Sequence, residues 1–574
     1  MEIEGDWGMT EIVCQRINND RLLPGHRRRG LDFVSLRNNP SSHHHPPSSN
    51  PLYRIVRTPA SIWAVLLLSA CAARIPSEAP APPTRSLATL IDSIIESPPL
   101  HRTSWGIAVR AVATGQMLYA RNAEKHFIPA SNTKLVVTLV AMGELGPDWR
   151  FTTEIHALGG IDTVASALVV RGSGDPTLSQ RFQSTDFAAL DSLADQVARA
   201  GVRVVDGDLV VDATRFVDER VHSTWEIGDL PFSYATPVGA FAIAEGTFRI
   251  VRTPGAHAGD PVRVEPIGAP ELQPLSVAAT TDTAGARTRW SIDYINRNDT
   301  IQIAGSLPAG AAPDTLRLAV VDAEDYAARA FRVALERAGV RVTGGTRVVR
   351  DTALLTVLTA NASSRTVARR ESPPVREIIA AILKPSQNWI AEQLLKTLGA
   401  ERGERGSWQA GIDVETRYLT TALGLDSLAF SLRDASGLSA QNLLTPAAIL
   451  DMLEHAHESA WAESYRTALP TAGEGSATLA RRLSGFEQRV FAKTGSIANV
   501  NSLSGYLQTD TGQGVIFSIL TNGSGVPSAA VRAAIDDVVR AIATGSAQPA
   551  ASARGGATGG AATGEAPNAR RVAR

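Results

Sequence analysis

An almost unbroken apolar run, Leu135 to Met142, follows a serine and a lysine spaced three residues apart. A helix with so few polar positions has to be buried, so this run predicts a helix in the core. Three residues are nearly one helical turn, which puts Ser131 and Lys134 on the same face. Burial disfavours the charged form of a lysine, and a neutral lysine can take the proton of a serine. The pair therefore indicates a reactive serine.

The pair alone is not specific, because a capping serine followed by a solvated lysine has the same spacing. Two later segments change that interpretation. Ser386-Gln387-Asn388 precedes an amphipathic helical run, and Lys493-Thr494-Gly495 ends a strand-like one. This set, in this order, resembles the three-part signature of penicillin-binding proteins and serine β-lactamases.

Length and composition narrow the remaining classes. The 574 residues exceed one ordinary core, so roughly two to four domains are expected. A net charge of -1 with 20% charged residues predicts a globular protein with no nucleic-acid partner. Both cysteines, Cys14 and Cys71, precede every motif, and the eleven histidines form no His-Glu-x-x-His pattern. We therefore expect no disulfide, no metal site and no cofactor in the folded body.

The N-terminal region resembles an export signal. Residues 1–53 show no sustained period and are predicted to be disordered, or to precede the true start codon. In residues 54–71, two arginines precede the apolar run Ile62–Leu68, which is far shorter than the roughly 20 residues of a membrane-spanning helix. Leu68-Ser69-Ala70-Cys71 resembles a bacterial lipobox, so Cys71 is a candidate lipid anchor; simple cleavage near Ala73 is the alternative. Export to the periplasm or cell envelope is expected, with residues 72–85 as a linker.

The two ends of the remaining chain are predicted to build one α/β domain. In residues 86–150, Ser86 caps a helix, a hairpin covers 106–120, and the Ser131 helix follows. In residues 366–545, helices are expected at 375–383, 388–398 and 447–455, strands at 501–507 and 514–520, and a helix near the end. Residues 546–574 are predicted to be a disordered tail.

The middle of the chain, residues 151–365, is predicted to be an inserted mostly-β module, perhaps nested as two domains. A helix is expected at 187–197 and another from Ala323 to Ala338, ending at Gly339. Asp206-Gly207 predicts a type I′ hairpin within 202–211. Short strands are expected to about 318, and Val- and Arg-rich strands from 340 to about 358.

Taken together, these features are similar to peptidase family S13, the D-alanyl-D-alanine carboxypeptidases and endopeptidases among low-molecular-weight class C penicillin-binding proteins. The resemblance covers about 87–545 and includes Gly172-Ser173-Gly174-Asp175-Pro176 and Asp434-Ala435-Ser436-Gly437-Leu438-Ser439. It implies an α/β fold: a penicillin-binding-protein/β-lactamase-like transpeptidase domain made from both chain ends, with inserted mostly-β domains. The long insert between the first two motifs separates the chain from β-lactamases.

The resemblance also implies the reacting groups. Ser131 would attack a D-alanine carbonyl of a peptidoglycan stem peptide, with Lys134 as its base. Ser386 would pass a proton to the leaving amine, and Asn388 would hold the substrate amide. Lys493 would bind the terminal carboxylate and make Lys134 less basic through like-charge proximity.

Four further positions are implied to bind substrate. Thr494 would share the carboxylate, and the small Gly495 would let a strand edge approach the substrate. The backbone N–H groups of Ser131 and Ser496 would form the oxyanion hole. Asp175 would either contact a substrate side chain or serve a turn.

Two positions depart from the family pattern. Gln387 stands where Asp is commonest, and Ala440 stands where Arg is frequent, which leaves the preferred stem peptide open.

The leading hypothesis is a serine-type D-Ala-D-Ala carboxypeptidase (EC 3.4.16.4) or DD-endopeptidase that β-lactam antibiotics inhibit covalently. The alternatives are a β-lactamase or esterase using the same residues, and a non-catalytic peptidoglycan-binding protein.

Overall fold

The structure is a computed structural model, and it describes residues 86–160, 162–267, 272–295, 300–360 and 363–545. The predictions for residues 1–53, for 54–71 with Cys71, for the linker 72–85 and for the tail 546–574 lie outside the described residues. Among the helices in those ranges, none has the length and apolar character needed to cross a membrane. The same ranges contain no group of three or more His, Cys, Asp or Glu side chains suited to a metal ion.

The two chain ends share one five-stranded antiparallel sheet, with strand order β19-β20-β21-β1-β2. β1 pairs with β21 along its whole length, from Ser104 opposite Asn522 to Ala111 opposite Val515. The predicted hairpin and the two predicted C-terminal strands are therefore neighbours, although more than half of the chain lies between them. The strands are β1 (Ser104–Ala111), β2 (Met117–Arg121), β19 (Val490–Ile497), β20 (Val500–Gln508) and β21 (Gly514–Asn522).

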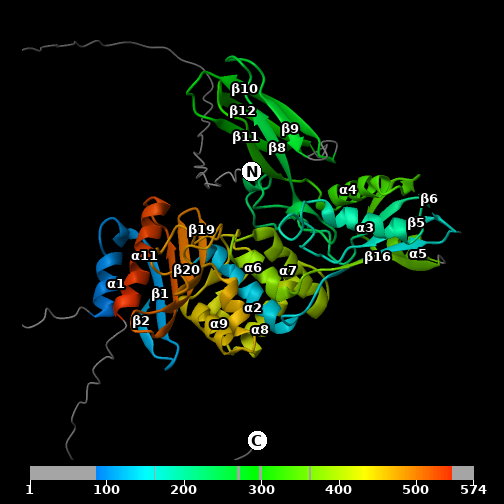
Figure 1. Cartoon of the computed structure of the whole chain (residues 1–574). Coiled ribbons are helices and arrows are strands. Elements are labelled where there is room, and N and C mark those ends of the chain that lie inside the picture. The colour runs from blue at the N-terminus through cyan, green and yellow to red at the C-terminus, as the bar shows by residue number, and fades with distance from the viewer. Residues whose placement is uncertain (1–85, 161, 268–271, 296–299, 361–362, 546–574) are drawn as a thin grey trace, which may run out of the picture. The chain divides into compact units, whose positions relative to one another are not determined.

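Helices cover both faces of this sheet, as the period-two alternation of its side chains requires. Ile107 and Val109 of β1 join the cluster made with α1 (Leu87–Ile95) and α11 (Ser528–Gly545), whereas Ala108 joins the opposite cluster. Figure 1 shows α1 and α11 together on one side of β1. As predicted, Ser86 caps α1 by accepting the Thr89 N–H. The opposite side holds α2 (Lys134–Glu144), α6 (Val375–Leu383), α7 (Asn388–Arg402), α8 (Trp408–Thr421), α9 (Pro446–Glu458) and α10 (Ala462–Ala468).

The segment from β3 to β16, here called the insert, carries a second five-stranded sheet of order β15-β7-β5-β3-β16. α3 (Ala188–Arg199) and α4 (Ala323–Arg337) pack on it. β16 runs past residue 365, where the sequence pattern placed the end of the insert, because it pairs with β3 as far as Glu371 opposite Thr152. The strands are β3 (Thr152–Leu158), β5 (Ala167–Arg171), β7 (Leu209–Asp212), β15 (Thr346–Val349) and β16 (Ser364–Glu371).

Three smaller sheets complete the insert, with orders β14-β6-β4, β13-β8-β9 and β10-β12-β11. Their strands are β4 (Val164–Ala165), β6 (Val204–Val205), β8 (Thr247–Thr253), β9 (Arg263–Ile267), β10 (Leu275–Asp282), β11 (Arg289–Ile295), β12 (Thr300–Pro308), β13 (Asp314–Ala319) and β14 (Arg341–Val342). A further short ladder, β17 (Phe430–Ser431) with β18 (Leu443–Leu444), precedes α9.

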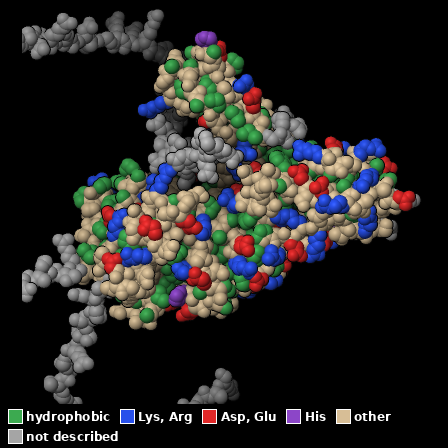
Figure 2. Space-filling view, viewed as in Figure 1, with side chains coloured by type: hydrophobic (Ala, Val, Ile, Leu, Met, Phe, Trp, Pro, Cys, Tyr) green, Lys and Arg blue, Asp and Glu red, His purple; other side chains and the backbone are tan. Residues whose placement is uncertain are grey.

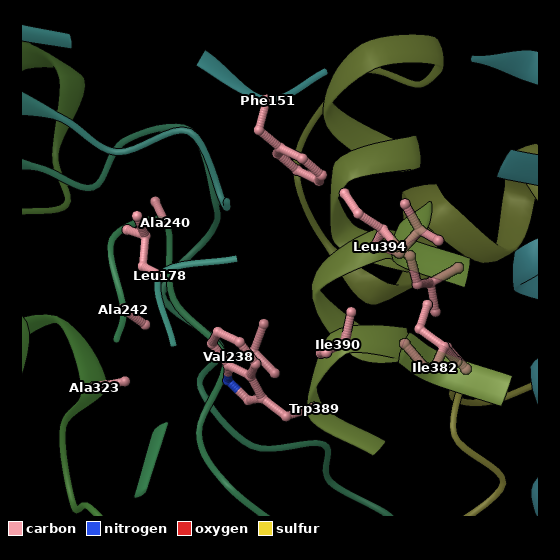
Figure 3. Packing of buried hydrophobic residues seen from close by; sticks show 14 of the residues in the cluster. Phe151, Leu178, Val238, Ala240, Ala242, Ala323, Ile382, Trp389, Ile390 and Leu394 are labelled. Atoms are coloured by element: carbon pink, nitrogen blue, oxygen red, sulfur yellow. The ribbon is translucent and has the colours of Figure 1, made fainter. Parts of the chain in front are cut away.

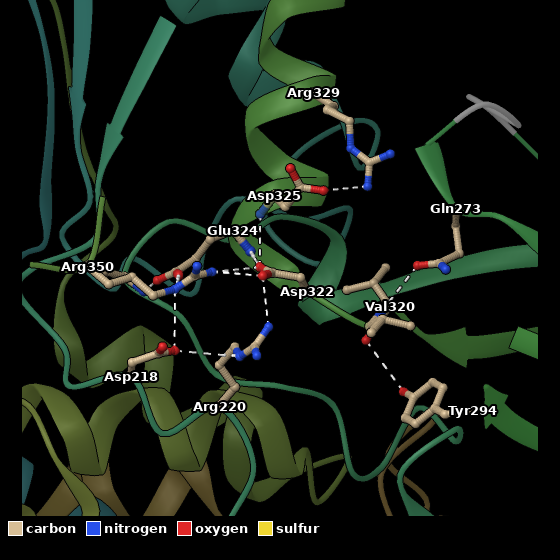
Figure 4. A network of polar contacts seen from close by, with 12 residues as sticks. Asp218, Arg220, Gln273, Tyr294, Val320, Asp322, Glu324, Asp325, Arg329 and Arg350 are labelled. Carbon is tan, nitrogen blue, oxygen red and sulfur yellow. Dashed lines mark hydrogen bonds and ion pairs between the residues drawn. The ribbon is translucent and has the colours of Figure 1, made fainter. Parts of the chain in front are cut away.

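An ionic network ties segments of the insert together (Figure 4). The Arg350 guanidinium lies 2.8 Å from Asp322 and 2.8 Å from Glu324, at the start of α4. Arg220 bonds to the same Asp322 at 2.8 Å. Glu324 is buried and also accepts the Ala240 N–H at 2.7 Å, so its charge is compensated on two sides. On the face drawn in Figure 2, acidic and basic side chains lie interspersed over the region of α3 and α4.

Two local predictions in the insert were wrong. Asp206-Gly207 makes no hairpin: β6 and β7 belong to different sheets and pair in parallel with other strands. Gly207 is needed there for a close approach, because a Cβ atom would lie 2.1 Å from the Ser166 carbonyl oxygen. Residues 352–358 form a helix, α5 (Thr352–Thr359), and not a strand. Asp351 caps it by accepting the Ala353 N–H, which overrides the β-like composition of the run.

The insert contacts α7 through both polar and apolar groups. The side chains of Asn388, Trp389 and Gln393 donate to the carbonyl oxygens of Tyr234, Pro237 and Gly239, at 2.8, 2.9 and 2.9 Å. Figure 3 shows the apolar part of this contact, in which Trp389 lies beside Val238. The insert is therefore attached to the helix that begins with the second sequence motif.

Candidate active site

Ser131 lies in a short 3₁₀ helix, Ala130–Thr133, that leads directly into α2. Side chains three residues apart eclipse one another in a 3₁₀ helix, and the Lys134 Nζ atom lies 3.0 Å from Ser131 Oγ. Lys134 is completely buried, as are the apolar residues of α2 that follow it. The structure thus confirms the buried helix, although Ser131 precedes the α-helix instead of lying in it.

Lys134 donates three hydrogen bonds, each to a different part of the chain. Besides Ser131, its Nζ atom donates to Asn388 Oδ1 at 2.7 Å and to the Ser436 carbonyl oxygen at 2.6 Å. Burial lowers its pKa to about 7, although the nearby carboxylates of Glu392 and Asp434 act to raise it. A substantial fraction of Lys134 is therefore neutral near pH 7, which suits an amine that accepts the serine proton.

Lys493 lies on β19 and is also completely buried. Its Nζ atom donates to Ser386 Oγ and to the Thr494 carbonyl oxygen, both at 2.8 Å. Burial, and then the charge of Lys134, hold the pKa of Lys493 well below its usual range. The expectation from the sequence is that the charge of Lys493 lowers the pKa of Lys134. In the structure, burial lowers the pKa of Lys134, and the charge of Lys134 lowers the pKa of Lys493.

Ser386 and Asn388 stand at the start of α7, separated by its capping residue. Gln387 caps the helix by accepting the Ile390 N–H at 2.9 Å, so the Ser386 hydroxyl does not serve as the cap. The φ angle of Ser386 is 62°, a left-handed conformation that costs a non-glycine residue free energy and recurs at functional sites. Asn388 connects Lys134, through its Oδ1 atom, with the Tyr234 carbonyl oxygen of the insert, through Nδ2.

Gly495 brings β19 against the turn that carries Ser131. A Cβ atom at this position would lie 2.2 Å from Ser502 Oγ, 2.8 Å from the Pro129 carbonyl oxygen and 3.0 Å from the Ser131 nitrogen. Asn132 fixes the same contact by donating to the Lys493 carbonyl oxygen at 3.0 Å. β19 is an edge strand of its sheet, so the backbone beside Ser131 is open to pairing with an extended peptide.

Thr494 and Ser496, two further predicted substrate residues, lie on β19 beyond Lys493. Thr494 Oγ1 donates to Thr478 Oγ1 at 2.8 Å, and Ser496 Oγ donates to Asn501 Oδ1 at 3.4 Å. Both residues belong to β19, on the C-terminal side of Lys493. Ala440 is exposed beyond the Asp434–Ser439 segment.

Asp175 is not part of this hydrogen-bonded group. It is buried; its Oδ1 atom accepts the N–H and hydroxyl of Thr177, and its Oδ2 atom pairs with Arg370. Burial raises the pKa of Asp175, while Arg370 opposes that shift. The carboxylate is occupied within the insert on both sides, which is the turn arrangement that the Gly-Asp-Pro sequence also allowed.

Sequence reasoning missed Glu392 and gave no residue-level role to Asp434. Glu392 is completely buried and accepts the N–H groups of Ser436 and Ala435 at 2.7 and 3.2 Å. Gly437, with φ at 78°, packs so closely on the Ser131 turn that a Cβ atom would lie 1.9 Å from the Ala130 carbonyl oxygen. No clear sequence signal pointed to Glu392, because it is one of several polar residues in this helical run, with Gln393, Lys396 and Thr397.

A buried lysine bonded to a serine, with a second lysine–serine pair beside it under the edge of an α/β sheet, defines a serine acyl-transfer enzyme of the penicillin-binding-protein and β-lactamase class. Comparison with known proteins narrows the class. The model of the D-Ala-D-Ala carboxypeptidase 3 (S13) family matches residues 87–544, so the chain belongs to that family. This confirms the predicted family and fold class.

Individual relatives agree. The chain is 36% identical, over 452 residues, to a D-alanyl-D-alanine carboxypeptidase of Actinomadura sp. (strain R39), covering 76% of this chain and 81% of the relative. It is 24% identical over 427 residues to D-alanyl-D-alanine carboxypeptidase DacB of Haemophilus influenzae, covering 73% and 85%. The crystal structure of penicillin-binding protein 4 (dacB) from Haemophilus influenzae matches with a TM-score of 0.68 at 23% identity, covering 78% of this chain and 97% of that one. At this identity the structural match shows the fold alone.

Proposed function

We propose that this protein is a serine-type D-Ala-D-Ala carboxypeptidase that acts on peptidoglycan stem peptides and is acylated by β-lactams at Ser131. The observation that carries the proposal is the 3.0 Å contact between the buried Lys134 ammonium and the Ser131 hydroxyl. The family membership, and relatives named as carboxypeptidases at up to 36% identity, support the same reaction. A related crystal structure is described as complexed with a β-lactam.

The reaction has two stages, acylation of Ser131 and hydrolysis of the resulting ester, and acylation requires two proton transfers and one bond exchange. Neutral Lys134 takes the Ser131 proton, and Oγ forms a bond to the carbonyl carbon of the penultimate D-alanine. The bond from that carbon to the terminal D-alanine nitrogen breaks, and the nitrogen leaves as an amine after receiving a proton through Ser386. Water then hydrolyses the ester by the reverse proton path, which restores Ser131.

The other predicted residues take positions around these atoms. Lys493 and Thr494 hold the terminal carboxylate at the β19 edge, and Asn388 orients both Lys134 and the substrate amide. The Ser131 and Ser496 N–H groups stabilise the oxyanion, a device in which losing one donor costs about 2.7–4 kcal/mol in other acyl-transfer enzymes. Gly495 leaves room for the substrate backbone. We assign Asp175 to the insert and not to the substrate.

Fluorescent penicillin tests the proposal. We expect stoichiometric, slowly released labelling of the wild-type protein and none of Ser131→Ala, with Ser496→Ala as a labelled control. Rapid turnover of the penicillin would instead indicate a β-lactamase, and absence of labelling in a folded protein would indicate a non-catalytic peptidoglycan-binding protein. Incubation with muropeptides separates the peptidase activities, because release of free D-alanine reports carboxypeptidase action and loss of crosslinked dimers reports endopeptidase action.

We further propose that the protein is exported to the periplasm and anchored through a lipid on Cys71. The support is the arginine-flanked apolar run before Leu68-Ser69-Ala70-Cys71, outside the described residues. Radioactive palmitate should label the wild-type protein in cells and not Cys71→Ala. Labelling of neither, with a mature N-terminus near residue 73, would support simple signal cleavage.

A further inference from the structure

A single peptide group joins Lys134 to a buried carboxylate. The Ser436 carbonyl oxygen accepts from Lys134 Nζ at 2.6 Å. The N–H at the other end of the same peptide group, that of Gly437, donates to Asp434 Oδ1 at 2.9 Å. In a buried environment such consecutive hydrogen bonds polarise one another. The negative charge of Asp434 therefore acts on the Lys134 ammonium through one peptide.

Asp434 is held entirely by N–H donors. Its Oδ1 atom also accepts from Asn442 Nδ2 at 2.7 Å, and its Oδ2 atom accepts the Ser439 N–H at 2.8 Å and the Trp225 indole N–H at 2.9 Å. Four donors around one buried carboxyl group form a site for an anion. Trp225 belongs to the insert, so this charge depends partly on the insert.

Glu392 holds the adjacent peptide from the side of α7. Its Oε1 atom accepts the Ser436 N–H at 2.7 Å, and its Oε2 atom accepts the Trp408 indole N–H at 2.7 Å. Burial, and then Asp434, raise the pKa of Glu392 to about 7. The short loop that faces Lys134 is thus fixed between two carboxyl groups, each of which has a tryptophan donor.

Among the other ionisable groups, Glu415 on α8, Lys396 on α7 and His222 on a loop lie close to one or both of these carboxyl groups. Lys493 on β19 lies close to Lys134, and Glu219 and Arg433 lie close to His222. Burial, and then the charges of Glu392 and Asp434, raise the pKa of Glu415 far above its usual range. The carboxylates that act to raise the pKa of Lys134 are those of Glu392 and Asp434.

We propose that Asp434 and Glu392 are positioning residues that set the proton occupancy of Lys134 through the loop Ala435–Gly437, with Trp225 and Trp408 as their anchoring donors. The inference rests on the proposed function only in that the proton held by Lys134 is the one taken from Ser131. Burial drives Lys134 towards its neutral form, and the two carboxylates counter this. Because these two effects oppose each other, Lys134 can both accept a proton and give it up near neutral pH.

The test is the pH profile of acylation by penicillin, normalised to its plateau. Trp225→Phe and Trp408→Phe each remove one N–H donor and keep the aromatic ring. In Trp408→Phe, Glu392 then holds its proton more readily. In Trp225→Phe, the Asp434 carboxylate and the loop that it holds are fixed less firmly, which weakens the bond from the Ser436 carbonyl oxygen to Lys134. In both variants Lys134 should lose its proton at lower pH. We expect the acidic limb of the profile to move to lower pH by several tenths of a unit, and by about one unit in Glu392→Gln.

Two controls match these variants. Trp389→Phe removes an equally buried indole donor from α7, but that donor bonds the Pro237 carbonyl oxygen, so the acidic limb should stay in place. Glu415→Gln replaces a buried carboxyl group whose oxygens have no hydrogen-bond partner among the described residues, and it should also leave the limb unmoved. Limbs that overlay the wild type in Trp225→Phe, Trp408→Phe and Glu392→Gln would show that the carboxylates serve the fold only, and would overturn the proposal.

A second readout does not depend on turnover. With lysine labelled at the ε-carbon with ¹³C, the Lys134 signal, assigned from Lys134→Met, can be titrated directly by NMR in each variant. A downward shift of its midpoint in Trp225→Phe and Trp408→Phe supports the inference, and an unchanged midpoint overturns it. If penicillin fails to label Ser131, the proposed function falls, yet this titration still decides the inference.

Discussion

The Lys493 ammonium lies 2.8 Å from the Ser386 hydroxyl oxygen, so the last of the three sequence motifs bonds directly to the second. Lys493 is buried and Ser386 is half-buried, and Lys493 lies close enough to Lys134 for the two charges to interact. In the proposed mechanism this pair supplies the proton that the leaving amine receives. Removing the hydroxyl should therefore slow chemistry more than it affects folding.

We expect Ser386→Ala and Lys493→Met to reduce the acylation rate by roughly 10²- to 10³-fold, as removal of a proton-transfer group does elsewhere. Stopped-flow measurement with a fluorescent penicillin reports this rate. Lys384→Met is the matched control, because Lys384 lies two residues before Ser386 but pairs with Glu474. Equal loss in Lys384→Met would point to general disruption of the loop.

The acylation rate should depend on pH through Lys134. Its pKa is lowered to about 7, and the proposed mechanism uses the neutral amine. The rate is therefore expected to rise about tenfold per pH unit below pH 7 and to level off above it. A Lys134→Arg variant, which stays charged, should be slow and show no such limb. A wild-type limb near pH 5 or pH 9 would contradict this assignment.

We expect Gln387→Asp to be harmful, although aspartate is the residue expected at this position from the family pattern. Its Nε2 atom donates to Glu245 Oε2 at 2.7 Å, and Glu245 is buried in an ion pair with Arg181. Gln387→Asp would set a second carboxylate against the first, so we expect slower acylation and lower thermal stability. The double variant with Glu245→Gln should recover part of both, and a double-mutant cycle measures the coupling.

Gly495→Ala should destabilise the protein by about 1–3 kcal/mol through overpacking. The new Cβ atom would lie 2.2 Å from Ser502 Oγ, which cannot turn away because it bonds the Pro129 carbonyl oxygen at 2.8 Å. Denaturant unfolding measures the loss. Adding Ser502→Gly removes the clashing atom and should restore part of the stability; no loss in Gly495→Ala would mean that β19 shifts freely.

Asp175→Asn should affect stability and not chemistry. The change leaves the Arg370 guanidinium, itself mostly buried, without its carboxylate, which typically costs about 3–5 kcal/mol. At temperatures where the variant is folded, its acylation rate and its release of D-alanine should match the wild type within about twofold. A large rise in KM for muropeptides would return Asp175 to the substrate site.

Much of the architecture was readable from the sequence. The predicted cap at Ser86 and the apolar stripes of the three helices located α1, α4 and α9, because side-chain caps and helical periodicity are local properties. The structure adds Asp322 and Thr445 as the caps of α4 and α9. The three motifs supplied the proposed reacting serines and lysines, and the structure pairs Lys134 with Ser131 and Lys493 with Ser386.

What the sequence could not provide depends on contacts between distant segments. Asp206-Gly207 has the composition of a hairpin, yet its neighbours pair with β4, β5, β14 and β15, and no local pattern records those partners. Glu392 likewise resembles a surface residue of an amphipathic helix until the loop after Asp434 packs over it. The direction of the electrostatic effect between the two lysines follows from burial, which a sequence motif does not contain.

Asn388, Trp389 and Gln393 are three of the side chains by which α7 holds the insert, and their contacts have a consequence for engineering and for divergence. Excising residues 152–371 to obtain a smaller catalyst would strand the amides of Asn388 and Gln393 and the indole of Trp389 without acceptors, at roughly 1–3 kcal/mol for each group left buried. One of these residues, Asn388, also bonds Lys134. A shorter relative of this enzyme would need different residues at these positions of α7 before it could lose the insert.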